Sequence, residues 1–149
     1  MQLLTFTLGG GDFGIPLKDI ELVERRSNEI VKLPATSAFI KGIVTIRGNI
    51  VPIYSLALRF GYKEEKLRYY IIVNVEEMRL GIEVDMVNAV IDAKEAEVLS
   101  VPSLLSEKSN YLHNIVVARR KRLIILIDVN SLIPHEEKVE IHQLIAENG

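Results

Sequence analysis

The amino-acid sequence predicts a mainly β protein folded as one domain over residues 1–149, either a barrel or a sandwich. Two observations support this prediction. About nine or ten short apolar runs, rich in Val, Ile, Leu and Tyr, are separated by turns that contain Gly, Asp, Asn or paired charges. Few segments are helical in pattern, and the one from His135 onward is the longest. A chain of 149 residues can also bury one substantial core.

The first strand is predicted by alternation. In Gln2–Leu8, apolar side chains at positions 4, 6 and 8 alternate with threonines, as in a half-buried strand. The elements expected up to the middle of the chain are this strand, a turn at 9–12, a strand-like step at 13–16, a turn or helical step at Lys18-Asp19, a strand at Ile20–Arg25, and a helical turn from Pro34 to about Ile40.

Residues 39–61, FIKGIVTIRGNIVPIYSLALRFG, form the most informative stretch. Two β-branched runs flank Gly48-Asn49, a pair that suits a tight hairpin, and Arg47 ends the first run. Pro52 in the second run favours an edge strand, because proline has no N–H to donate to a ladder. A short helix should follow, and Gly61 suits the left-handed position just after a helix.

The second half reads as further strands and a final helix. A polar segment at 61–68 could divide the chain into two small β units. Beyond it we expect strands at Tyr69–Val75, 79–84 and 87–92 with turns at Glu76-Glu77 and Asp85-Met86, a brief helical segment at 93–98, a long loop at 99–110, a hairpin of 111–118 with Arg122–Ile127, and the C-terminal helix. In that helix Val139, Leu144 and Ile145 should share one face, with Ile141 near its edge.

Composition limits the possible partners and compartments. Hydrophobic residues make up 48% and charged residues 26%, and the net charge of −2 gives no global attraction to nucleic acid or anionic membrane. Cysteine is absent, which excludes disulfides and thiolate metal sites and fits a reducing compartment. The N-terminus lacks a basic n-region, and the apolar run at 123–127 is too short to span a bilayer. We therefore expect a cytoplasmic protein that binds no nucleic acid and does not insert into a membrane.

No residue pattern predicts a catalytic centre, a cofactor site or a metal site. Gly9, Gly11 and Gly14 match G-x-G-x-x-G, but a strand-like step follows where a dinucleotide site needs a helix, so a glycine hairpin is expected. His135 and His142 lie two helical turns apart, too far to share a metal ion easily, and are expected to be exposed to solvent.

Two groups of charged residues have both a chemical and a structural interpretation. Glu83 and Asp85 share a strand face and could serve acid–base chemistry, but no nucleophile motif accompanies them, so we favour a charged outer strand face. The cluster Arg119-Arg120-Lys121-Arg122 could bind phosphates or an acidic partner. Charged turns also commonly keep a hairpin soluble, and we favour that interpretation.

Four segments resemble the CheW-like coupling domains, the adaptors that join bacterial chemoreceptors to the histidine kinase CheA. The most specific is 39–61, with its Arg-Gly turn, Pro-containing strand and short helix. The others are LLTFTL…FGIPLKDIELVERR near the start, LGIEVDMV at 80–87, and RLIILIDVNSLI at 122–133. Three residues depart from the family pattern: Thr45 stands for Asn, Ser55 for Asp, and Asn114 for a frequent glycine.

The resemblance implies two five-stranded SH3-like β-barrels packed on a shared hydrophobic core, with short helices and a C-terminal helix. It also implies an adaptor, not an enzyme, that binds the cytoplasmic tip of methyl-accepting chemoreceptors and the regulatory domain of CheA in membrane receptor arrays. The isolated protein should be a monomer without a cofactor. The receptor-binding residues implied are Ile20, Leu22, Gly42, Val44 and Arg47, and the kinase-binding residue is Leu104.

Three of these residues have a structural role to weigh beside the functional one. Arg47 could pin the hairpin by bonding carbonyls, or lie at the groove between the barrels where the receptor tip docks, and the two roles are compatible. Gly42 would let a receptor helix approach closely, because it has no Cβ. Leu104 would be either an exposed kinase contact or an anchor of its loop to the core.

Three other assignments compete with a free-standing adaptor. The coupling part of a CheV-like protein is disfavoured because no receiver domain follows Gly149, and the kinase's own regulatory domain because the chain starts on its first strand and carries no ATPase segment. A small β-barrel enzyme or ligand carrier would be favoured by a buried polar cavity with converging ionisable groups.

Overall fold

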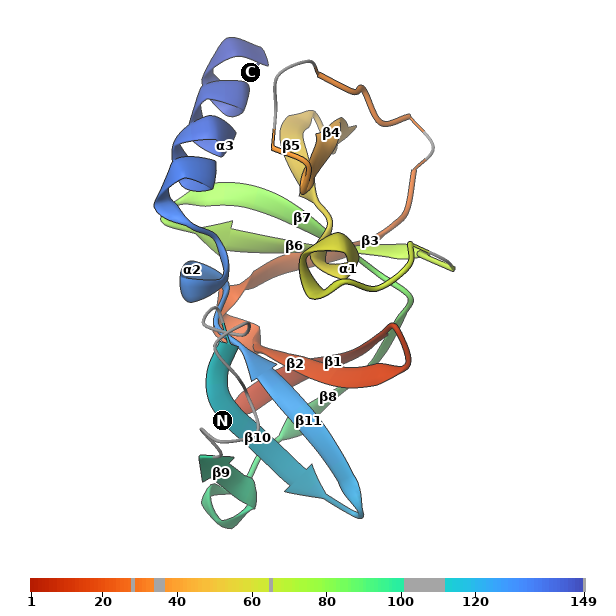
Figure 1. Cartoon of the computed structure of the whole chain (residues 1–149), viewed down its shortest axis with the longest axis vertical. Coiled ribbons are helices and arrows are strands. Elements are labelled where there is room, and N and C mark those ends of the chain that lie inside the picture. Colours follow the sequence, from red (N-terminus) through yellow and green to blue (C-terminus); the bar gives the residue numbers. More distant parts are fainter. Residues whose placement is uncertain (28, 34–36, 65, 101–111, 149) are drawn as a thin grey trace.

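The computed structural model describes residues 1–27, 29–33, 37–64, 66–100 and 112–148, whose strands form two sheets (Figure 1). The six-stranded sheet, in the order β8-β1-β2-β11-β10-β9, contains β1 (Gln2–Leu8), β2 (Gly11–Pro16), β8 (Met86–Asp92), β9 (Val98–Ser100), β10 (Leu112–Arg119) and β11 (Arg122–Ile127). The five-stranded sheet, in the order β3-β6-β7-β5-β4, contains β3 (Ile20–Arg25), β4 (Ile40–Ile46), β5 (Asn49–Tyr54), β6 (Tyr69–Val75) and β7 (Met78–Val84). The helices are α1 (Leu56–Phe60), α2 (Val129–Leu132) and α3 (His135–Asn148), and 3-10 turns lie at Leu17–Asp19 and Glu95–Glu97. The mainly β prediction is confirmed.

The chain begins in the six-stranded sheet, builds the five-stranded one, and then returns. The predicted division at 61–68 is wrong, because β6 and β7 pair with β3 and β5 from before that segment. Each sheet contains one parallel pair, β2 with β11 and β5 with β7. Within the described residues neither sheet is closed by a ladder between its edge strands, and the first has six strands where five were expected.

One large hydrophobic cluster is shared by the two sheets and the helices, in line with the shared core that the family resemblance implies. Phe6 and Phe13 of the six-stranded sheet stack at 5.6 Å between ring centroids, and Phe13 stacks on Phe60 of α1 at the same distance. Two smaller clusters fill the other face of each sheet. The buried members of the shared cluster include Leu4, Ile15, Tyr54, Ile71, Leu80, Ile82, Leu132, Ile141 and Leu144.

Four hairpin tips carry two consecutive residues with positive φ, the backbone of a type I′ turn, whose twist matches that of paired strands. The pairs are Gly9 and Gly10 (57° and 80°), Arg47 and Gly48 (50° and 81°), Glu76 and Glu77 (49° and 68°), and Arg120 and Lys121 (49° and 66°). The glycine hairpin at 9–11 is therefore confirmed. The turn predicted at Gly48-Asn49 lies one residue earlier, because Asn49 already pairs with Ile46.

Pro52 does not mark an edge strand, because β5 lies between β7 and β4. Its partner across the ladder is Ile43, whose N–H donates to the Val31 carbonyl (2.9 Å) and whose carbonyl accepts from the Val31 N–H (2.8 Å). The backbone groups of Ile43 thus point away from β5. Proline therefore removes no hydrogen bond from this pair.

The caps of α1 match the residues found there. Ser55, which departs from the family's usual aspartate, still caps the helix, because its hydroxyl oxygen accepts from the Leu58 N–H (3.2 Å). Gly61 adopts the left-handed conformation (φ 78°, ψ 22°) just after the helix, as predicted. The same logic applies at α2, where the Asp128 carboxylate accepts from the Asn130 N–H (3.1 Å).

Helix α3 packs beside the five-stranded sheet (Figure 1), but with a different face from the one predicted. Ile141 and Leu144 are buried and Ile145 is half-buried, whereas Val139 is 44% exposed. The difference arises because Glu137, four residues before Ile141, is itself buried on that face. The buried face of α3 therefore contains Glu137, Ile141 and Leu144, and differs from the face that the apolar residues alone predict.

Candidate functional site

Glu83 of β7 lies at the centre of a buried ionic cluster, which corrects the outer strand face expected for it. Its side chain is 1% exposed, with one carboxylate oxygen 2.6 Å from Arg26 Nε and the other 2.6 Å from Lys41 Nζ. Lys41 Nζ also lies 2.7 Å from the Glu64 carboxylate. Two cations and two carboxylates therefore balance, as buried charges require.

This cluster ties four separate segments together. It joins the end of β3 through Arg26, β4 through Lys41, β7 through Glu83, and the segment after α1 through Glu64. Tyr70 of β6, the cross-strand partner of Glu83, donates its hydroxyl to the Ser27 carbonyl (3.0 Å) beside it. Because both oxygens of Glu83 are engaged by cations of the same chain, the group is arranged for structure rather than for proton transfer.

Asp85 is separated from Glu83 in its surroundings. It follows β7 and accepts a hydrogen bond from the Gly9 N–H (3.3 Å). Its burial raises the pKa of the carboxyl, against the smaller opposing effects of that hydrogen bond and of Lys66 and Arg68. Glu83 and Asp85, which the sequence places on one strand face, therefore have different partners and do not form an acid–base pair.

A second buried carboxylate, Glu137, fixes α3 to the five-stranded sheet. The Tyr54 hydroxyl donates to it at 3.0 Å and the Ser37 hydroxyl at 3.1 Å, while Arg59 Nη1 lies 3.5 Å away. Glu140, three residues further along the helix and so on the same side, accepts from the Ser37 N–H (2.9 Å). The helix is therefore anchored by polar contacts as well as by Ile141.

Tyr54 should make the protein sensitive to alkali. Burial, and next the negative charge of Glu137, raise the pKa of Tyr54 above its usual 10.0. Above about pH 10 an unfolded tyrosine releases its proton whereas folded Tyr54 keeps it, so stability is present below that pH and falls as the pH rises. Burial also raises the pKa of Tyr70, which acts in the same direction.

We expect Tyr54→Phe to lose about 1 kcal/mol at pH 8, since it removes one hydrogen bond to a carboxylate. Above pH 10 its stability should fall less steeply than that of the natural protein, by up to about 1.4 kcal/mol per pH unit. Urea unfolding between pH 8 and 11 measures both effects. An equal slope for the two proteins would show that Tyr54 ionises normally in the folded state.

The five residues expected at a receptor site lie on the two edge strands of the five-stranded sheet and on the β4–β5 turn. Ile20 and Leu22 of β3 are half-buried, with Leu22 packed against the cluster that contains Val44. Val44 is 3% exposed. The structure thus places both residues at one hydrophobic cluster, with Val44 buried in it and Leu22 half-buried at its edge.

Gly42 has a structural explanation that the sequence did not suggest. Its φ is +150°, and a Cβ added there would lie 2.2 Å from the Val31 carbonyl oxygen. The space beside Gly42 is therefore occupied by the chain's own segment after β3, which bridges to Ile43. A glycine is needed here whether or not a receptor helix approaches.

Among the described residues, the Arg47 guanidinium makes no hydrogen bond to a carbonyl of its own hairpin. Its guanidinium Nε lies 3.1 Å from a carboxylate oxygen of Glu24 on β3, and its side chain is 68% exposed. The contact spans the gap between the two edges of the sheet. Leu104, the residue expected at the kinase contact, lies outside the described residues.

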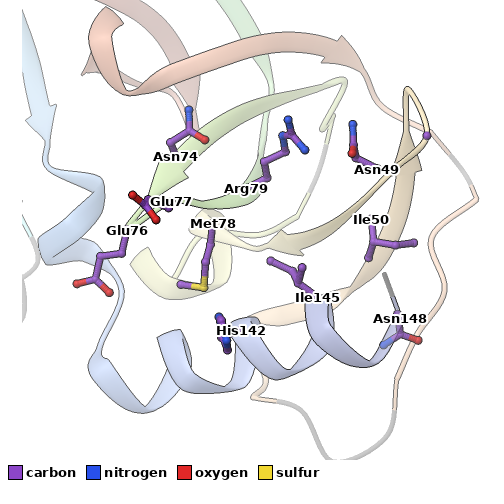
Figure 2. A pocket seen from close by; sticks show the side chains of 11 residues that line it. Asn49, Ile50, Asn74, Glu76, Glu77, Met78, Arg79, His142, Ile145 and Asn148 are labelled. Carbon is purple, nitrogen blue, oxygen red and sulfur yellow. The ribbon is translucent and has the colours of Figure 1, made fainter.

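A groove of about 720 Å³ that the sequence did not predict lies between α3 and the β6–β7 hairpin (Figure 2). Met78, Ile50 and Ile145 give it an apolar lining, and His142 projects from the helix on one side. Of its charged residues, Arg79 pairs with Glu21 (2.7 Å) and Glu76 with Lys138 (3.2 Å). Arg79 and Glu76 are thus neutralised within the chain, whereas Glu77 and His142 also line the groove.

The two histidines of α3 are not placed to form a metal site. His135 and His142 are both exposed on α3, as predicted. Among the described residues, no group of three or more His, Cys, Asp or Glu side chains is placed to hold a metal ion. In that same part of the chain, no helix is both long enough and apolar enough to cross a bilayer.

Comparison with known proteins gives one consistent family. A sequence model of the CheW-like domain matches residues 2–137. The chain is 30% identical to the chemotaxis protein CheW of Treponema pallidum (strain Nichols), over 96% of this chain and 88% of the relative. It is 29% identical to the chemotaxis protein CheW of Klebsiella aerogenes, over 91% of this chain and 83% of the relative.

Solved structures agree with the sequence comparison. The crystal structure of the scaffolding protein TtCheW from Thermoanaerobacter tengcongensis matches with a TM-score of 0.78 and 27% sequence identity. The match covers 91% of this chain and 94% of that chain. The two-sheet arrangement described above is therefore shared with a scaffolding protein.

Proposed function

The chain belongs to the CheW-like domain family, and on this basis we propose that it is a chemotaxis adaptor that couples chemoreceptors to the histidine kinase CheA. It works by binding, with no reaction of its own. The observation that carries the proposal is the extent of the match, because residues 2–137 include every strand described in both sheets. A binding scaffold of this size can offer separate surfaces to two partners.

We also propose that the curved five-stranded sheet corresponds to one of the two SH3-like barrels expected for the family. Two contacts across its open side support this. Val31, in the segment that follows β3, bridges to Ile43 of β4, and Arg47 reaches Glu24 of β3 at 3.1 Å. Both contacts draw the edge strands together, as barrel closure requires.

The receptor tip is proposed to dock where these edge strands approach each other. Near these contacts Val31 is 55% exposed and the Arg47 side chain is 68% exposed, while Val23, 37% exposed, projects from the face of β3 opposite to Glu24. Spaced apolar anchors of this kind are how a groove accepts an amphipathic helix. Leu22 and Val44 would not contact the receptor directly, but would hold β3 and β4 in position by packing on one hydrophobic cluster.

The kinase is proposed to bind elsewhere, through its regulatory domain and with Leu104 as a contact. In the cell the protein would be cytoplasmic and recruited to receptor arrays, and it would be a monomer when isolated. A pull-down with the CheA regulatory domain and a receptor-tip fragment tests the proposal. We expect each partner to be retained alone and both to be retained together. Retention of neither partner would refute the adaptor function.

Arg47→Ala should separate binding from stability. The Arg47–Glu24 pair is exposed, so its loss should change the free energy of unfolding by at most about 1 kcal/mol. We expect affinity for the receptor tip to fall about tenfold, a loss typical of one charged interface contact, with kinase affinity unchanged. Titrations with each partner measure the two affinities separately.

Arg79→Ala provides the matched control. Arg79 pairs with Glu21 of the same β3 strand at 2.7 Å but lines the groove beside α3. It should leave receptor affinity unchanged. If Arg47→Ala binds the receptor tip as well as the natural protein does, Arg47 is not part of the docking surface.

A further inference from the structure

The basic turn at Arg119–Arg122 borders a cavity, an arrangement that the proposed coupling function does not use. The cavity, of about 210 Å³, lies between the β10–β11 hairpin and the edge strand β8. Arg119, Arg120 and Arg122 line it, whereas Lys121, in the middle of the same turn, does not. A turn that is charged only for solubility does not need three of its arginines to line one hollow.

The charges around this cavity favour an anion. Three arginines and one aspartate, Asp12, line it, which gives a net charge of +2. Arg122 is held by Asp12 through two hydrogen bonds of 2.6 and 3.1 Å. Arg119 donates to the Asp92 carbonyl at 3.3 Å and lies 3.9 Å from the Glu97 carboxylate. Two guanidinium groups are therefore already held at the cavity before any ligand arrives.

Arg120 is the remaining cation. Within the described residues it makes neither a hydrogen bond nor an ion pair, and it lies at the hairpin tip with φ 49°. A guanidinium presents donors in a fixed planar fork that matches a carboxylate or a phosphate. The Arg122–Asp12 pair already shows that two-hydrogen-bond geometry in this same turn.

The base of the cavity is apolar and its wall is polar. Ile124 is 7% exposed and Ile91 is half-buried against the same hydrophobic cluster. Asn88, on the wall, is oriented by a hydrogen bond from its amide nitrogen to Thr7 Oγ1 (3.0 Å). A ligand that fits would carry its negative charge at the rim and a short apolar stem toward the isoleucines.

We propose that this cavity is a binding site for a compact anion, a carboxylate or phosphate group on a short apolar stem, with Arg120 as its free contact. The anion could belong to a small free molecule or to an acidic side chain of a protein partner, because the recognition chemistry is the same. Either ligand would couple the β10–β11 hairpin to β8.

The test is a titration of the isotope-labelled full chain followed by amide NMR shifts, at constant ionic strength maintained with chloride. The probes are inorganic phosphate, citrate, and a short peptide of alternating glutamate and leucine. Saturable shifts are expected at Asn88, Ala89 and 119–122. Arg120→Gln should weaken binding about tenfold, the effect of one charge-assisted contact. Lys121→Gln, which removes the same charge from the same turn, should weaken it less than about twofold.

The outcomes separate the sources of the anion. Binding of phosphate or citrate supports a small-molecule ligand, and binding of the peptide alone supports a side chain from a protein. Equal weakening by Arg120→Gln and Lys121→Gln would reduce the effect to diffuse charge and overturn the site, as would the lack of saturable shifts with all three probes. Because neither coupling partner is present, the result is independent of the adaptor function.

Discussion

Glu83→Gln is expected to lower the free energy of unfolding by about 3 kcal/mol. The substitution keeps the size of the side chain but removes the charge that faces Arg26 and Lys41, both at 2.6 Å. Breaking a buried ion pair usually costs about 3–5 kcal/mol. The lower end applies because the Arg26 and Lys41 side chains are 36% and 19% exposed and can recover some hydration.

Glu77→Gln is the matched control, because Glu77 is an exposed glutamate at the tip of the hairpin that contains Glu83's strand. Its effect should stay within about 0.5 kcal/mol. Urea unfolding of both variants, and of Lys41→Met alone and combined with Glu83→Gln, forms a double-mutant cycle. Strict additivity of the Lys41 and Glu83 effects would mean that the two residues are not coupled and that the cluster is not a stabilising unit.

The local features of the fold could be predicted from the sequence because neighbouring residues determine them. The alternation in Gln2–Leu8, the glycine turn after it and the helix end at Gly61 all depend on a few adjacent positions. The position of Gly61 illustrates this well, because only the preceding turn of α1 decides its left-handed backbone.

The features that were missed depend on residues far apart in the chain. The sequence favours a solvent-facing position for Glu83 because Arg26 and Lys41, which neutralise it, lie several strands earlier in the chain. Pro52 suggested an edge strand because the preference of proline for edges does not take account of Val31. The backbone of Val31 forms the hydrogen bonds of Ile43, the partner of Pro52. No periodicity in the sequence links these positions.

The site residues divide in the same way. The family resemblance, rather than spacing or composition, indicated 39–61 as the part of the chain to examine. It could not reveal that Val44 faces inward or that Arg47 reaches Glu24, because both follow from how the edge strands approach in space. The cavity at Arg119–Arg122 was hidden for the same reason, since β8 supplies its other wall.

Gly42→Ala is the second substitution expected to have a large effect, with a loss of about 3–5 kcal/mol in the free energy of unfolding. Two penalties combine at this position. The φ of +150° strains any residue with a Cβ, and that Cβ would lie 2.2 Å from the Val31 carbonyl oxygen. Because this oxygen belongs to the backbone, the clash can be relieved only if the segment that bridges to β4 moves.

Gly48→Ala separates the two penalties. Gly48 also has a positive φ, +81°, but a Cβ there would meet nothing within 4 Å. It should therefore cost only the backbone strain, about 1–2 kcal/mol. Thermal or urea unfolding of the two variants gives the difference. Equal losses would mean that the Val31 segment yields easily, leaving Gly42 available for the close approach of a receptor helix. A larger loss for Gly42→Ala would assign the glycine to the chain's own packing. Any fall in receptor affinity in that variant would then report a displaced edge strand instead of a lost contact.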